Sequence, residues 1–326
     1  MTGSKVNHDI RSNHGRTIYM PEYFSGELGW GNLELPNVYL ADDTAALYPN
    51  GTKLVQGERV FHYGRYLGKL TESGTAVTAT TPGDDLAGKF LFTMAAQQDM
   101  ANGLLVRKLA NELHIVFNTT VSAAQSNDYY SGGWVTGKDT VPADERMFWR
   151  YIVKHTYQSS TGTSFEIWND DTKSYSKVSL SSYSNVSILE LDQPVINSKS
   201  GMATTLMQNP WKHIVWQSAS AYSTNRGKVM GACMHNDPAM NGYGWYQTWG
   251  PMSCMHLEYA LGGAEGCNTL ILMADGSISA RNSNSGTYDR LDDHKPIIGY
   301  LLSDPRSLTG SFQGESLPMI FVTISP

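Results

Sequence analysis

Short runs of β-branched and aromatic residues, each ended by Gly, Pro, Asn or Asp, recur along most of this 326-residue chain. Runs of about four to eight such residues between turn residues are typical of short antiparallel strands. A helix competes with a strand only at 90–102, where the apolar residues are continuous and periodicity does not decide. The pattern predicts an all-β protein of β-barrel or β-sandwich domains.

Composition divides the chain into three parts. Residues 1–50 scatter aromatic side chains among Gly and Pro without sustained periodicity. We expect an extended N-terminal arm there, ordered against the body of the protein or against a neighbouring subunit, because such a segment cannot bury a core alone. We expect a first β-rich domain over 51–205 and a second, barrel-like or sandwich-like, over 206–326.

The positions of several strands can be predicted from the residue pattern. Residues 104–109 and 113–120 predict a hairpin closed by 110–112, and 164–171 predicts a strand running into a turn. Serine alternates with larger residues over 174–187, which favours a solvent-facing strand pair over a flexible linker. After Pro210 the apolar density rises, and six strands are predicted at 211–216, 228–234, 242–251, 270–274, 296–302 and 318–324.

Charge excludes one class of partner. The chain has 24 Lys and Arg against 30 Asp and Glu, a formal charge of −6, and its longest basic cluster is Arg107–Lys108. Nucleic-acid binding needs clustered cations, so it is not expected. No apolar run approaches the roughly 18 residues of a membrane helix, and the N-terminus lacks the apolar stretch of a secretion signal. We therefore expect neither a membrane partner nor export by that route.

Motifs for chemistry are weak. The three cysteines, Cys233, Cys254 and Cys267, have no C-x-x-C spacing and are interpreted as semi-buried thiols, so no metal or other cofactor is expected. No nucleophile or phosphate-binding motif occurs. Asp237 and His294 lie in predicted loops and could form an acid/base pair, which leaves a β-fold hydrolase as one alternative. The adjacent carboxylates at 42–43, 84–85 and 170–171 are interpreted as turn residues.

Aromatic residues supply the candidate interaction sites, and no catalytic residue is predicted. In 242–251, strand alternation places Trp245 and Trp249 on one face and Tyr246 on the other. Such residues are typical of core packing or a subunit interface, and a platform for stacking on sugar rings is the alternative. The candidate subunit-interface residues are Tyr19, Tyr23, Phe24, Trp30, Trp245 and Trp249.

Several segments, in this order, resemble a family of tailed-bacteriophage virion proteins. The order carries the resemblance, which spans roughly residues 46–326. The segments are 46–55 (Ala-Leu-Tyr-Pro-Asn-Gly-Thr-Lys-Leu-Val), 58–65 (Glu-Arg-Val-Phe-His-Tyr-Gly-Arg), 119–135 (ending Tyr-Tyr-Ser-Gly-Gly-Trp-Val), 242–251 (Gly-Tyr-Gly-Trp-Tyr-Gln-Thr-Trp-Gly-Pro), 297–302 (Ile-Ile-Gly-Tyr-Leu-Leu) and 315–324 (Glu-Ser-Leu-Pro-Met-Ile-Phe-Val-Thr-Ile).

The resemblance implies a non-enzymatic capsid decoration or cement protein on the outside of the phage head. Its expected partners are the major capsid protein and copies of itself, with a homotrimer favoured because closed cyclic symmetry matches capsid lattice points. Assembly in the host cytoplasm would explain an outside-facing protein without an export signal. The alternatives are the major capsid protein, which would need a long spine helix, and a tail or fibre protein that binds host glycan.

Overall fold

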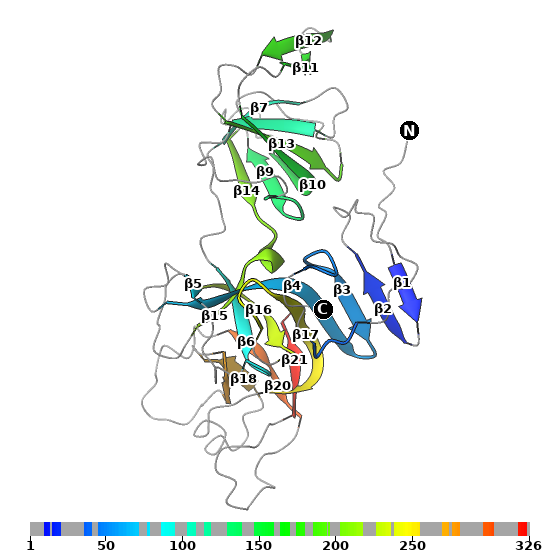
Figure 1. Cartoon of the computed structure of the whole chain (residues 1–326), viewed down its shortest axis with the longest axis vertical. Coiled ribbons are helices and arrows are strands. Elements are labelled where there is room, and N and C mark those ends of the chain that lie inside the picture. Colours follow the sequence, from blue (N-terminus) through cyan, green and yellow to red (C-terminus); the bar gives the residue numbers. More distant parts are fainter. Residues whose placement is uncertain are drawn as a thin grey trace, which may run out of the picture. The chain divides into compact units, whose positions relative to one another are not determined.

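The structure is a computed structural model, and most of its described residues lie in β-strands (Figure 1). This confirms the all-β prediction. The described residues are 10–13, 15–20, 36–40, 45–71, 77–78, 86–94, 103–108, 114–118, 129–138, 147–159, 164–169, 174–179, 185–193, 195, 203–217, 226–235, 238–254, 269–273, 276–280, 296–302 and 319–324.

Two compact units divide the chain. One takes its strands from residues 96–209, and the other takes them from the stretches 10–95 and 210–326 that flank it in sequence. The predicted boundary near 206 therefore falls close to the end of the first unit. Residues 51–95, which we grouped with the first β-rich domain, instead belong to the other unit, in which the strands at 59–70 and 90–94 pair with strands beyond residue 210.

The first unit contains a closed barrel of antiparallel strands in the order β10-β13-β8-β7-β14-β9 (Figure 1). The predicted hairpin over 104–120 is present as β7 and β8. The predicted strand at 164–171 and the first strand of the serine-rich segment pair with each other as a separate two-stranded sheet, β11 and β12. The bounds are β7 (Gly103–Lys108), β8 (His114–Asn118), β9 (Trp134–Lys138), β10 (Met147–Ser159), β11 (Ser164–Asn169), β12 (Ser174–Ser179), β13 (Asn185–Leu191) and β14 (Ala203–Met207).

Alternate side chains of β10 fill the interior of the barrel. Phe148 and Ile152 point inward, and Phe148 lies over Gly137, its direct partner on β9, so that a Cβ at Gly137 would overlap the phenyl ring. A glycine opposite an aromatic residue thus makes room for one large side chain. The buried cluster is Tyr130, Val135, Phe148, Ile152, Leu189, Leu191, Val195 and Leu206.

The second unit is a 13-stranded sheet. Its pairings are antiparallel except that β15 runs parallel to β4. The bounds are β1 (Ile10–Asn13), β2 (Arg16–Tyr19), β3 (Lys53–Gln56), β4 (Arg59–Leu70), β5 (Val77–Thr78), β6 (Phe90–Met94), β15 (Ile214–Gln217), β16 (Arg226–Cys233), β17 (Tyr243–Ser253), β18 (Thr269–Leu272), β19 (Ile278–Ala280), β20 (Ile297–Leu301) and β21 (Met319–Thr323), with the 3-10 turn η3 (Pro210–Lys212) before β15.

The N-terminal segment orders partly against the body of the protein, which is one of the two possibilities left open for residues 1–50. Strands β1 and β2 form a hairpin, and β2 pairs with β3. Met20, Val38 and Tyr48 are buried. In the 90–102 stretch, 90–94 form the strand β6, and the remainder lies outside the described residues.

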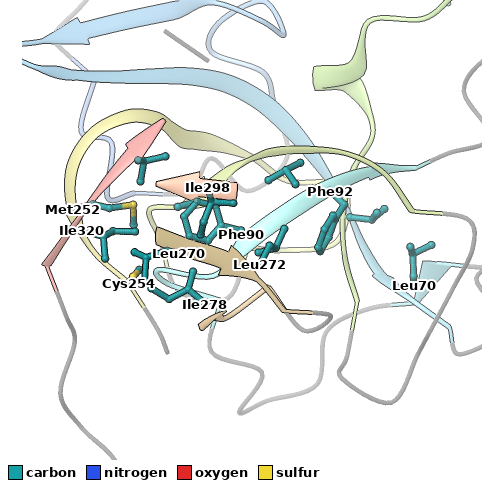
Figure 2. Packing of buried hydrophobic residues seen from close by; sticks show 14 residues of the cluster. Leu70, Phe90, Phe92, Met252, Cys254, Leu270, Leu272, Ile278, Ile298 and Ile320 are labelled. Atoms are coloured by element: carbon teal, nitrogen blue, oxygen red, sulfur yellow. The ribbon is translucent and has the colours of Figure 1, made fainter. Parts of the chain in front are cut away.

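The pairing of β4 with both β15 and β17 closes a circuit of pairings through β4, β15, β6, β16 and β17. One buried cluster takes residues from all five strands, and Trp211 of η3 packs against it. The same sheet contributes a second cluster, in which side chains of β6, β18, β20 and β21 meet (Figure 2). The first cluster is Tyr66, Leu86, Leu91, Ile214, Trp216, Met230, Cys233 and Tyr246.

A β-bulge in β17 changes which face its residues occupy. Gln247 lies opposite Phe61 of β4, whereas Trp249 lies opposite Val60, so one extra residue is inserted between them. The Gln247 Nε2 lies 3.1, 3.2 and 3.0 Å from the carbonyl oxygens of Trp249, Gly250 and Pro251, and so holds the bulge. Because an inserted residue reverses the alternation, the expectation that Trp245 and Trp249 share one face is wrong.

Candidate functional site

The outer wall of the barrel carries an exposed aromatic surface, which we name the barrel face. Its residues come from three neighbouring strands, β14, β9 and β10, and point away from the barrel interior because they alternate with the core positions. Trp149 is 56% exposed and Met147 is 69% exposed. The barrel face consists of Trp134, Met147, Trp149, Tyr151 and Met207.

Ring contacts fix the geometry of the barrel face. The indole of Trp134 stacks on that of Trp149, with ring centroids 4.2 Å apart and planes 12° apart. The ring of Tyr151, the direct cross-strand partner of Trp134, meets it edge-on at 4.9 Å. Cross-strand aromatic pairs of this kind stabilise a sheet and hold each ring in place. The barrel face is therefore a preformed apolar surface whose rings are held in fixed orientations.

Charged side chains near the barrel face form hydrogen bonds with backbone groups of β10. Arg150 Nη1 donates to the carbonyl oxygen of Trp149 at 2.7 Å, and the backbone N–H of Tyr151 donates to Asp192 Oδ1 at 3.1 Å. Lys138, the strand partner of Met147, lies at the rim. A surface with an apolar centre and a polar rim is typical of a protein contact.

A second aromatic surface, which we name the sheet face, lies on β17, β21 and β20. The rings of Tyr300 and Phe321, direct cross-strand partners, stack with centroids 5.1 Å apart and planes 6° apart. Trp249 meets Phe321 edge-on at 5.5 Å. The sheet face consists of Trp249, Tyr300, Met319 and Phe321, with exposed Ile297 and Leu302 beside them.

The predicted interface residues occupy different environments. Trp249 is half-buried on the sheet face, and Tyr19 of β2 is 37% exposed. Trp245 is 2% exposed and contacts the rings of Tyr48 and Tyr63, so it packs within its own unit. Tyr23, Phe24 and Trp30 lie outside the described residues.

Sequence reasoning missed the barrel face. The signal is present in 147–152, where Met, Trp and Tyr alternate with Phe, Arg and Ile, so that large apolar side chains occupy both sides of one strand. A strand can bury one side in its own core, and the other side must then face solvent or a partner. Such a strand is a direct indication of a surface aromatic patch.

Buried titratable groups gather at the end of the five-strand circuit. The Cys233 thiol donates to the carbonyl oxygen of His235 at 3.2 Å, and its Sγ lies 3.5 Å from His235 Nδ1. Burial lowers the pKa of His235 to about 4, so the ring is neutral near pH 7 and does not supply the cation that activates a thiolate. Burial also raises the pKa of Tyr246 well above its usual value.

The remaining residues that the sequence suggested for catalysis or metal binding are not in the described part of the chain. Asp237, His294, Cys267 and the three pairs of adjacent carboxylates lie outside the described residues. Within the described ranges, no group of three or more His, Cys, Asp or Glu side chains is arranged to hold a metal ion. The described part of the chain also has no helix long and apolar enough to cross a membrane.

The fold and its surfaces define an all-β protein with two exposed aromatic faces. No protein-family model matches the sequence, and no curated protein or solved structure matches it significantly.

Proposed function

We propose that this chain is a non-enzymatic virion structural protein that binds the outside of a phage head as a decoration or cement protein. The observation that carries the proposal is the barrel face, on which an indole is more than half exposed and is held in place by a second indole. Exposed Trp and Tyr held in a fixed geometry are typical of the residues that dominate protein–protein binding. The particle context of the proposal comes from the resemblance of sequence segments, in their order, to phage particle proteins.

Binding would stabilise the shell by mass action, because a protein that binds only the assembled state favours that state over free subunits. The partners are the major capsid protein and other copies of this chain, arranged as a homotrimer. Symmetry repeats each contact many times, so a modest face becomes strong in total. The low charge of the chain, 17% of residues against roughly 25% in ordinary domains, supports contacts with little charge to desolvate.

The test uses particles of the phage that encodes the chain, grown with the wild-type protein, with Trp149→Ala, or with Lys154→Gln. Lys154 is an exposed residue of the same strand and serves as the matched control. We expect immunogold label on the heads, a fixed ratio of this chain to the major capsid protein, and an occupancy at least tenfold lower for Trp149→Ala only. Absence of the chain from particles would overturn the proposal. If heads fail to form when the chain is deleted, it is the shell subunit itself.

A tail or fibre protein that binds host glycan is the second candidate, and the exposed indole of Trp149 favours it. A flat aromatic ring can stack on the apolar face of a sugar as well as on a protein side chain. Label on the tail, together with glycan-array binding that is lost in Trp149→Ala and kept in Lys154→Gln, would select this function over decoration.

A further inference from the structure

Two glycines leave a gap in the wall of the five-strand circuit. Gly64 of β4 and Gly244 of β17 are direct cross-strand partners. A Cβ added at Gly64 would lie 2.5 Å from Ile214 Cδ1 and 2.8 Å from the carbonyl oxygen of Trp211, and one added at Gly244 would overlap the His235 ring. The gap is therefore filled by η3, by the start of β15 and by His235. We name this filling group the cap.

Two histidine rings and the backbone of a third histidine hold the cap. The ring of His62 on β4 stacks on the Trp211 indole, with centroids 4.7 Å apart and planes 9° apart. His213 follows η3 directly, and its backbone N–H donates to the carbonyl oxygen of Pro210 at 3.4 Å, which closes the turn. The His235 ring fills the space above Gly244 and meets the Tyr246 ring edge-on at 5.9 Å.

The groups around these rings would not stabilise a positive charge. Lys53 of β3 and Lys228 of β16 act on His62, while Lys212 of η3 and Arg65 of β4 act on His213. His62 Nδ1 also lies 3.3 Å from the neutral Thr248 Oγ1 of β17. The neighbours of His235 are the Cys233 thiol of β16 and the Tyr246 phenol of β17. In the part of the chain that the structure describes, the charged groups that act on His62 and His213 are cations, and His235 is affected by burial.

We propose that the cap is an acid-sensitive closure: protonation of His62, His213 and His235 drives η3 and Trp211 out of the gap and exposes the cluster beneath. Among the described residues, a protonated His62 would face the cations Lys53 and Lys228, and a protonated His235 would be a charge buried beside the Cys233 thiol and the Tyr246 ring. The inference stands independently of the proposed virion function, because it rests on the packing within one unit.

The pH window follows from the direction of the shifts. Burial, with the neighbouring lysines, lowers the pKa of His62 to about 3, and burial lowers the pKa of His213 and His235 to about 4. The closed state thus holds the rings neutral, while an open state takes up protons near pH 6.5. The stability of the closed cap is complete above pH 6.5 and falls as the pH drops towards 4.

Two buried cysteines allow a direct test. Cys233 lies in the cluster under the cap, whereas Cys254 lies in the second cluster of the same sheet and is the internal control. Labelling with dithiodipyridine, a thiol reagent that reacts in acid, is followed residue by residue with peptide mass spectrometry between pH 7.5 and 3.5. We expect the ratio of Cys233 to Cys254 labelling to rise at least tenfold on acidification, and the rise to be at least fivefold smaller in the double variant His62→Phe, His213→Gln.

Simultaneous labelling of both cysteines, which indicates unfolding of the whole sheet, would overturn the proposal, and so would no labelling down to pH 3.5. An identical rise in the double variant would also overturn it. His62→Phe keeps a flat ring against Trp211, so the variant is designed to fold. If the variant does not fold, the histidines of the wild-type protein are titrated by NMR instead. Histidine rings of the cap that titrate near pH 6.5 would overturn the proposal, because the closed cap holds these rings neutral.

Discussion

On the barrel face, Trp149 stacks on Trp134 and keeps 56% of its surface in solvent. On the sheet face, Phe321 stacks on Tyr300, touches Trp249 from the other side and is itself half-buried. Both faces use the same device, a cross-strand aromatic stack beside an exposed methionine. They differ in the exposure of the outer ring of the stack, which is 56% for Trp149 on the barrel face and 42% for Tyr300 on the sheet face.

This difference in ring exposure predicts which face contributes more to folding and which contributes more to binding a partner. A ring flanked by two others contributes mainly to its own sheet, whereas a ring held on one side contributes less to the fold and can bury its free side on contact. The barrel face should therefore carry more of the binding energy and the sheet face more of the folding energy. The predictions below test this division, from the largest expected effect to the smallest.

Replacing Phe148 with Ala should lower the free energy of unfolding of the barrel by about 3–5 kcal/mol, because the cavity lies in the barrel core over Gly137. Hydrogen exchange of β9 and β13 during denaturant titration measures this loss. Ile320→Ala is the counterpart in the sheet unit and should affect β20 and β21 instead. If either substitution destabilises both units equally, the two units are one cooperative body.

Acid should weaken the sheet unit. His235 has its pKa lowered from 6.5 to about 4 by burial, so it binds a proton more readily when unfolded. Stability is then fully present above pH 6.5 and falls below it, by on the order of 3 kcal/mol at pH 4. Thermal unfolding at pH 7.5, 5.5 and 4.5, followed by exchange in β4 and β17, should show this decline. An unchanged sheet midpoint across that range would contradict it.

Phe321→Ala should lower the free energy of unfolding of the sheet unit by about 1–3 kcal/mol, because the ring loses contacts with both Trp249 and Tyr300. Urea denaturation measures the change. Thr323→Ala is a control on the same side of β21, since it shortens the side chain directly opposite Trp249 without removing an aromatic ring. A loss no larger than that of the control would show that the stack contributes nothing to the fold.

Trp149→Ala should have the smallest effect on stability, at most about 1 kcal/mol, since one side of the indole is already in solvent. The substitution should instead weaken self-association. Light scattering of the wild type at increasing protein concentration should reach three times the mass of one chain. The variant should need at least a tenfold higher protein concentration to reach the same mass. A variant that associates normally but unfolds several kcal/mol more easily would reverse the comparison of the two faces.

Local pattern was enough to predict the class of fold and several pairs of strands. The hairpin of β7 and β8 joins residues close in sequence, and its turn residues mark where the chain reverses. The barrel strands also come from one continuous stretch of the chain. The N-terminal hairpin was not predicted, because 10–13 and 16–19 carry no long run of strand-forming residues and are ordered by pairing with β3.

Long-range pairing was beyond local pattern. The parallel pair joins Ile214 to Tyr66, and nothing in either segment indicates that the other is its neighbour. The grouping of 51–95 with the C-terminal strands follows from such pairs, so the predicted boundaries differ from the observed units. The position of Trp249 was predicted wrongly because a bulge has no reliable sequence signal, whereas the barrel face could have been found from the alternation in 147–152.

The bulge at Thr248 acts as a phase shift within one strand. Residues before it follow one alternation and residues after it the other, while Gln247 ties the shift to the backbone. The loss or gain of a single residue at this point would exchange the inward and outward sides of everything that follows in β17. A chain of this fold can therefore acquire or discard an outward-facing aromatic residue through a change in length, with its amino-acid composition almost untouched.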